Sequence, residues 1–191
     1  QAASMLLPRD PAGSFDLDLA ASRADGDGGA AYEGEFRPHS LAFDLRGQRI
    51  VFDSVTGGVF FDAAGGQAEG VRAAGPDFAV AGDASWAWVG PGQTLVEAAF
   101  SADAPGLSPR VLAVLPAELV AGFEEVGLGV SGPVSVLEAT ISANVPAEGD
   151  VSVRTSGAVH ASGVSASVGV PIEDGVGTVW FEADAQAGRP V

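Results

Sequence analysis

The sequence from residue 78 to residue 100, FAVAGDASWAWVGPGQTLVEAAF, constrains the fold of this chain more than any other stretch. Its two tryptophans, Trp86 and Trp88, are two positions apart, and side chains at that spacing on a β-strand point to the same face of a sheet. The Val-Gly-Pro-Gly sequence at 89–92 predicts a turn, and residues 95–100 predict the returning strand. Because indole rings bring a large apolar surface, we expect both tryptophans to face inward in the core of a β-sheet.

Alternating apolar and polar residues predict strands along most of the chain. Phe15, Leu17 and Leu19 alternate with Asp16 and Asp18, which is typical of a half-buried strand. Further strands are expected at 31–37, 41–45, 49–54, 59–62, 110–115, 129–130, 134–145, 151–156, 159–170 and 177–185.

The rest of the chain offers little helix. Residues 63–76 are rich in Ala and Gly and are expected to form a loop, whereas 116–126 places Leu119, Phe123 and Val126 at helical spacing. Short strands separated by Gly and Pro turns predict an all-β fold. We expect an antiparallel β-sandwich of the Ig-like or jelly-roll type, with at most one short helix near 116–126.

The N-terminal residues differ from the rest of the chain. Residues 1–13 are expected to form an extended arm, and residues 14–191 a single domain, with a subdivision near 101–110 as the alternative. Pro8 and Pro11 oppose regular structure in the arm. Its three consecutive apolar residues are Met5, Leu6 and Leu7. We expect them to pack on a neighbouring subunit as an interaction arm, or on their own domain if the arm is its first edge strand.

Charge and composition exclude several classes of partner. Against 25 acidic residues the chain has nine basic ones, for a net charge of −16, and it has no cysteine. Nucleic acid and anionic membrane surfaces would both repel such a chain, and disulfides and thiol chemistry are excluded. No apolar run is long enough to insert in a bilayer. Because the chain starts at Gln1, we expect a mature end left by signal-peptide removal, and therefore a secreted or cell-surface, extracytoplasmic protein.

No motif in the sequence identifies a reaction. The chain lacks a Gly-x-Ser-x-Gly sequence, and His39 and His160 are its only histidines. Paired carboxylates of a glycosidase would need a defined separation, and Glu97 beside Trp86 and Trp88 is the best candidate. We therefore expect a protein that is not an enzyme, in which these three residues bind a partner or a glycan.

Two groups of residues are candidate metal ligands. Asp25 and Asp27, in a Gly-rich loop between strands, could supply oxygen ligands to Ca²⁺, although the spacing is not that of an EF-hand. His39 and His160, with a carboxylate, could bind a transition metal. We expect no bound cofactor, with Ca²⁺ favoured over a transition metal if an ion binds.

Three short stretches resemble a known family. Residues 83–92, DASWAWVGPG, the Gly-Pro at 132–133, and residues 160–191 are similar to the surface-anchored repeat proteins of actinobacteria of the choice-of-anchor M type, over roughly the last 110 residues. The resemblance implies an extracytoplasmic β-sandwich encoded beside metal-type ABC transporters. The family's closing repeat has a second histidine, whereas His160 is followed here by Ala-Ser-Gly.

Together these patterns predict an exported, non-enzymatic module for binding or assembly, structural or adhesive, whose partners are other surface proteins, copies of itself or a glycan. The alternative is a metal- or haem-related extracytoplasmic binding protein that serves an ABC uptake system.

Overall fold

A computed structural model of the chain describes residues 9–23, 30–115, 117–125, 127–167 and 171–187. Most of them lie in strands, and the described helices are two short ones. The strands are β1 (Arg9–Arg23), β2 (Ala30–Leu45), β3 (Gln48–Phe52), β4 (Ser54–Asp62), β5 (Gly65–Ala74), β6 (Ala79–Gly90), β7 (Gln93–Ala104), β8 (Gly129–Val130), β9 (Val134–Val145), β10 (Val151–Ser167) and β11 (Pro171–Ala187). The helices are α1 (Pro109–Val114) and α2 (Ala117–Glu125).

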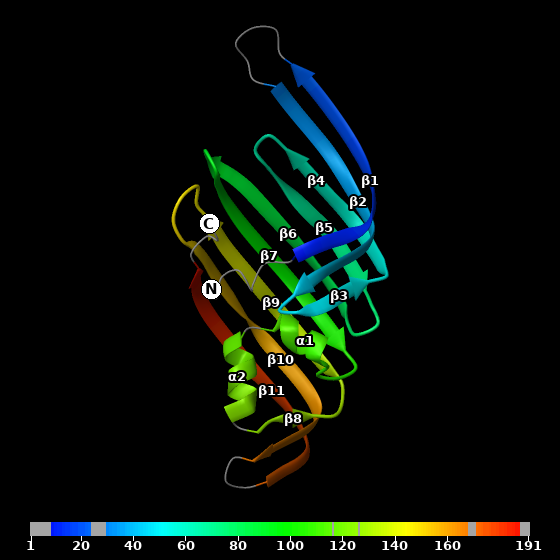
Figure 1. Cartoon of the computed structure of the whole chain (residues 1–191), viewed down its shortest axis with the longest axis vertical. Helices are drawn as coiled ribbons and strands as arrows, with labels where there is room; N and C mark the ends of the chain where they lie inside the picture. The colour runs from blue at the N-terminus through cyan, green and yellow to red at the C-terminus, as the bar shows by residue number, and fades with distance from the viewer. Residues whose placement is uncertain (1–8, 24–29, 116, 126, 168–170, 188–191) are drawn as a thin grey trace.

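The strands form one open antiparallel sheet (Figure 1). Its order is β1-β2-β4-β5-β6-β7-β9-β10-β11, while β3 pairs with β2 and β8 pairs with β10. The expected all-β, antiparallel, sandwich-like fold is confirmed. The strands follow one another as a meander, which is a simpler order than that of Ig-like or jelly-roll folds.

A partial second layer covers one face of the sheet. The first half of β2 pairs with β4, and its second half pairs with β3. The second half of β2 therefore leaves the main sheet and leads into β3. In Figure 1, β3, α1 and α2 lie in front of the sheet, across its middle and lower parts. We call this side the front face and the opposite side the back face. The guanidinium of Arg46, in the β2–β3 turn, donates to the carbonyl oxygen of Leu115 at 2.7 Å and joins β3 to the end of α1.

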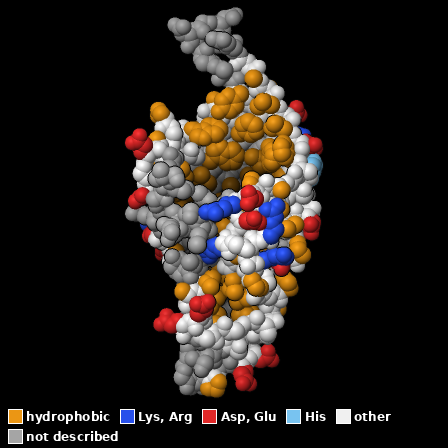
Figure 2. Space-filling view, in the orientation of Figure 1, with side chains coloured by type: hydrophobic (Ala, Val, Ile, Leu, Met, Phe, Trp, Pro, Cys, Tyr) orange, Lys and Arg blue, Asp and Glu red, His pale blue; other side chains and the backbone are white. Residues whose placement is uncertain are grey.

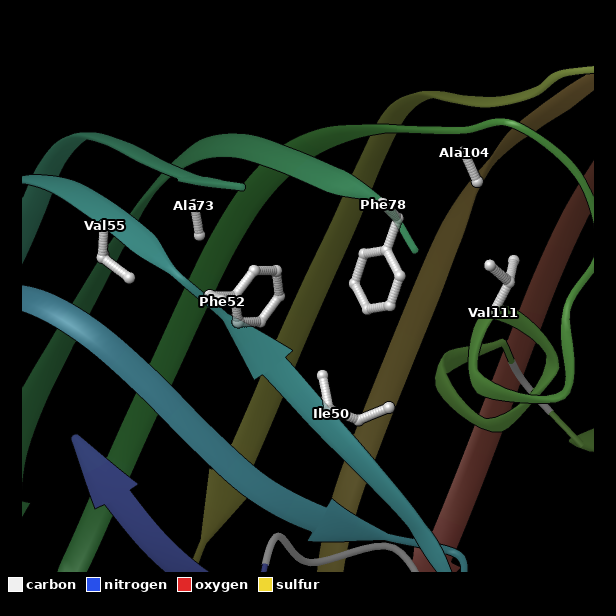
Figure 3. Close-up of a cluster of buried hydrophobic side chains, with 7 residues drawn as sticks. All are labelled: Ile50, Phe52, Val55, Ala73, Phe78, Ala104 and Val111. Atoms are coloured by element: carbon white, nitrogen blue, oxygen red, sulfur yellow. The ribbon is translucent and has the colours of Figure 1, made fainter. Parts of the chain in front are cut away.

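The main core lies between this second layer and the sheet. Figure 3 shows its side chains, which converge from β3, β4, β5, β7, α1 and the segment between β5 and β6: Ile50, Phe52, Val55, Ala73, Phe78, Ala104 and Val111. Ile50 has no exposed surface, and the rings of Phe52 and Phe78 meet edge-on with centroids 5.3 Å apart. Each large apolar side chain buried in this way contributes about 1.5–3 kcal/mol to folding. A smaller cluster, Val134, Val159 and Ala161, extends the core under β8.

Two predicted segments differ from the structure. Residues 63–76 contain strand β5, because hydrogen bonds to β4 on one side and β6 on the other hold even an Ala- and Gly-rich segment in the sheet. Residues 110–115 were expected to be a strand, but they belong to helix α1. Pro109 occupies the start of this helix, and the Ser108 hydroxyl accepts a hydrogen bond from the Val111 amide at 3.3 Å.

Other boundaries are close to those expected. The helix predicted at 116–126 is α2. Residues 9–13 belong to β1, the first strand of the sheet, which agrees with the edge-strand alternative for this part of the segment 1–13, while Met5, Leu6 and Leu7 lie outside the described residues. Among the described helices, none has the length and apolar character needed to cross a membrane.

Candidate functional site

The front face is apolar far beyond the part that the second layer covers. On β6, every second side chain from Val80 to Trp88 points to this face, because β-strand side chains alternate. The upper end of the sheet in Figure 1, beyond β3 and α1, has no described element in front of it.

Two registered rows of residues define this uncovered area. The first row runs from β1 to β10 through Leu19, Gly34, Phe61, Gly66, Trp86, Val96, Ala143 and Val153. The second row runs from β1 to β11 through Leu17, Phe36, Val59, Ala68, Ala84, Ala98, Ile141, Thr155 and Ala183. Thr155 is the only polar residue in the two rows, and no residue in them is charged. We call these two rows the apolar trough.

The trough is open to solvent. None of its side chains is buried, and Leu17 and Leu19 at its β1 side are 53% and 58% exposed. Figure 2 shows hydrophobic side chains gathered over the upper part of the front face, where the surface is hollowed. Charged side chains lie below this hollow, across the middle of the same face. Contiguous exposed apolar surfaces of this kind are typical of interaction sites.

Two aromatic rings form the floor of the trough. The Trp86 indole lies against Gly66 on β5, and the Phe61 ring lies against Gly34 on β2, in the space that a Cβ atom would take at each glycine. Because the glycines have no side chain, each ring can lie over the backbone of the neighbouring strand.

The tryptophans are placed differently from the sequence prediction. Trp86 and Trp88 do share one face, as expected, but they are not core residues: Trp86 is half-buried and Trp88 is 41% exposed. The core is filled by Phe52 and Phe78 instead. The two indoles face the trough or its rim because the second layer ends before it reaches them.

Glu97 lies on the opposite side of the sheet from the tryptophans. It belongs to a row on the back face that is polar except for Phe60: Asp18, Glu35, Phe60, Gln67, Ser85, Glu97, Ser142, Arg154 and Asp184. The middle of this row lines a shallow groove. The predicted binding set of Trp86, Trp88 and Glu97 is therefore split between two faces.

An ion pair joins β10 to β11 on the back face. The Arg154 guanidinium donates to the Asp184 carboxylate at 2.7 Å, with both side chains more than half exposed. This hydrogen bond lowers the pKa of Asp184 and raises that of Arg154 from their ordinary values. Surface pairs of this kind contribute little to stability because water and salt screen them.

The predicted metal ligands are not brought together. Nε2 of His39, on β2, lies 2.9 Å from the carboxylate of Asp16, and Nδ1 of His160, on β10, lies 2.9 Å from the Thr178 hydroxyl. β2 and β10 stand near opposite ends of the strand order. Asp25 and Asp27 lie outside the described residues. Within the part of the chain that is described, no group of three or more His, Cys, Asp or Glu side chains could hold a metal ion.

No family model, curated protein or solved structure matches the chain. The resemblance to surface-anchored repeat proteins therefore stays a prediction. The apolar trough was not predicted from the sequence. The sequence pattern that indicates the trough is the alternation of Ala, Gly and aromatic residues with polar residues along β4 to β7.

Proposed function

We propose that the chain is a non-enzymatic binding module whose apolar trough holds an elongated apolar ligand, of which the acyl chain of a lipid fits best. The observation that carries the proposal is the pair of rows, apolar except for Thr155, that crosses the main strands of the sheet without being buried. Covering such a surface is favourable by roughly 25 cal/mol for each Å² of apolar area removed from water.

The chemistry of the trough favours an acyl chain over a protein partner. Protein interfaces carry about one hydrogen bond for each 100–200 Å² of contact, whereas the trough offers one hydroxyl, that of Thr155, and the indole N–H groups. Its surface is hollowed rather than flat (Figure 2), which suits a flexible chain that can follow it. The absence of charged residues from the two rows also supports a binding role rather than acid–base catalysis.

The haem-binding alternative has less support. A haem in the trough would need an axial ligand there, but no residue of the two rows is a histidine. His160 pairs with Thr178 on the back face, while its neighbours Val159 and Ala161 face the core. The extracytoplasmic location, the partner proteins and the glycan ligand remain predictions from the sequence.

Quenching of tryptophan fluorescence by a dibrominated fatty acid tests the proposal. Bromine quenches only indoles that it contacts, so we expect saturable quenching from Trp86 and Trp88 and none from Trp180. Trp180 is the matched control, because it is 77% exposed and pairs with Ala158 on the back face. The double variant Trp86→Phe/Trp88→Phe should lose the quenching and Trp180→Phe should keep it. Quenching that is lost in Trp180→Phe, or that never saturates as the fatty acid is added, would contradict the proposal.

A further inference from the structure

We propose that the outer edge of β1 binds an extended segment of another polypeptide, in which apolar residues alternate with basic ones, as an additional strand of the sheet. β1 is the first strand of the order, and β2 is its only partner among the described strands. The proposal does not depend on what the trough binds.

The edge of β1 has the hydrogen-bonding groups that strand addition needs. In an antiparallel pair, every second residue directs its N–H and C=O groups away from the partner strand. The irregularities of β1 lie at its start: Asp10 has a φ of 48°, and the register with β2 shifts twice before Phe15. From Phe15 to Arg23 the register is continuous, and no proline interrupts it. Long regular edges of this kind are usually protected, and an unprotected one is a template for another strand.

The front side of this edge is apolar. Phe15, Leu17 and Leu19 are 54%, 53% and 58% exposed, although the Phe15 ring already packs on Phe36 with centroids 4.7 Å apart. An added strand with apolar residues on the front side would cover all three and continue both rows of the trough by one position.

The back side of the same edge is acidic, and this sets the chemistry of the partner. Asp16 contacts His39, yet its side chain stays 70% exposed. Asp18 stands opposite Glu35, which is itself paired with Arg37. An added strand would place its own side chains directly beside the two aspartates, where basic residues are favoured and acidic ones repelled.

The same charges disfavour a second copy of this chain as the partner. Pairing β1 with another β1 would place Asp16 and Asp18 beside the same residues of the copy. Pairing it with the edge of β11 would place them beside Glu182 and Asp184, which also face the back. Charge complementarity therefore points to a different, basic segment.

Two short peptides test this proposal, one with Leu alternating with Arg and one with Leu alternating with Glu. We expect the Leu/Arg peptide to bind the whole chain and to slow hydrogen exchange of the outward-facing amides between Phe15 and Ser22. The Leu/Glu peptide should not bind. Equal binding of both peptides, or protection confined to β11, would overturn the proposal.

A charge reversal provides the control for the charge argument. The variant Asp16→Arg/Asp18→Arg should bind the Leu/Arg peptide about tenfold more weakly and gain affinity for the Leu/Glu peptide. The matched variant Glu69→Arg/Glu97→Arg reverses the same number of charges on the back face away from the edge, and it should keep the original preference. Circular dichroism establishes that both variants are folded. An unchanged preference in the β1 variant would overturn the proposal.

Discussion

At the scale of single residues, the trough depends on glycines that leave room for aromatic rings. Gly66 on β5 lies beneath the Trp86 indole, and Gly34 on β2 lies beneath Phe61. Both glycines belong to strands rather than turns, where glycine lowers stability. The stability that these glycines cost is offset because each aromatic ring gains contact with the backbone of the neighbouring strand.

The substitution Gly66→Ala tests this arrangement. Its Cβ atom would overlap the Trp86 ring and approach the carbonyl oxygen of Phe60, so we expect a loss of about 1–3 kcal/mol in the free energy of unfolding. Tryptophan emission should shift to longer wavelength as the indole is lifted into water. Urea unfolding followed by fluorescence measures both effects.

The control for this prediction is Gly90→Ala. Gly90 lies at the end of β6, and a Cβ atom there would meet no atom within 4 Å. This variant should leave stability and emission nearly unchanged. If the two variants behave alike, the indole does not lie on Gly66 as described.

At the scale of elements, helix α1 and strand β3 decide how much of the front face is covered. They meet through Arg46 and through the core side chains Ile50 and Val111. The start of α1 is fixed by Ser108, whose hydroxyl caps the Val111 amide. Because α1 is only six residues long, its stability rests on this cap and on packing rather than on helix propensity.

The substitution Ser108→Ala should therefore lower the free energy of unfolding by about 1 kcal/mol. Ser108→Asp keeps an oxygen acceptor at the cap and should retain most of the stability. Urea midpoints of the two variants and the unchanged chain make the comparison. Equal loss in both variants would mean that the hydroxyl does not cap α1.

The elements also show what the sequence can predict. β1 and the start of β2 are predictable because large apolar residues alternate with charged ones, as Leu17 does with Asp18. β5 is not, because Ala and Gly carry little strand preference, and its strand form comes from hydrogen bonds to two distant neighbours. Ser108 and Pro109 are typical of a helix start, but Val111 and Val114 are β-branched and favour a strand. The sequence therefore predicted a strand where α1 lies.

At the scale of the whole molecule, a twisted sheet has an apolar front face and a more polar back face, and its second layer covers only part of the front face (Figures 1 and 2). Trp86 and Trp88 were expected in the core because of their large apolar surface, and a sandwich covered along its full length would have buried them. How far a second layer extends depends on contacts such as that of Phe52 with Phe78, which are far apart in sequence. Strand patterns alone carry no information about them.

The central claim is that the front face, and not the back face, binds acyl chains, and two neighbouring alanines on β7 allow a direct test. Ala98 lies in the trough, while Ala99 points to the back face beside Asp83 and Thr140. The measurement is the affinity of a dibrominated fatty acid for Ala98→Asp and for Ala99→Asp, followed by tryptophan quenching. A carboxylate under a bound acyl chain cannot be hydrated, so Ala98→Asp should weaken binding by at least about tenfold, while Ala99→Asp should leave it unchanged. Equal affinities for the two folded variants would contradict the account.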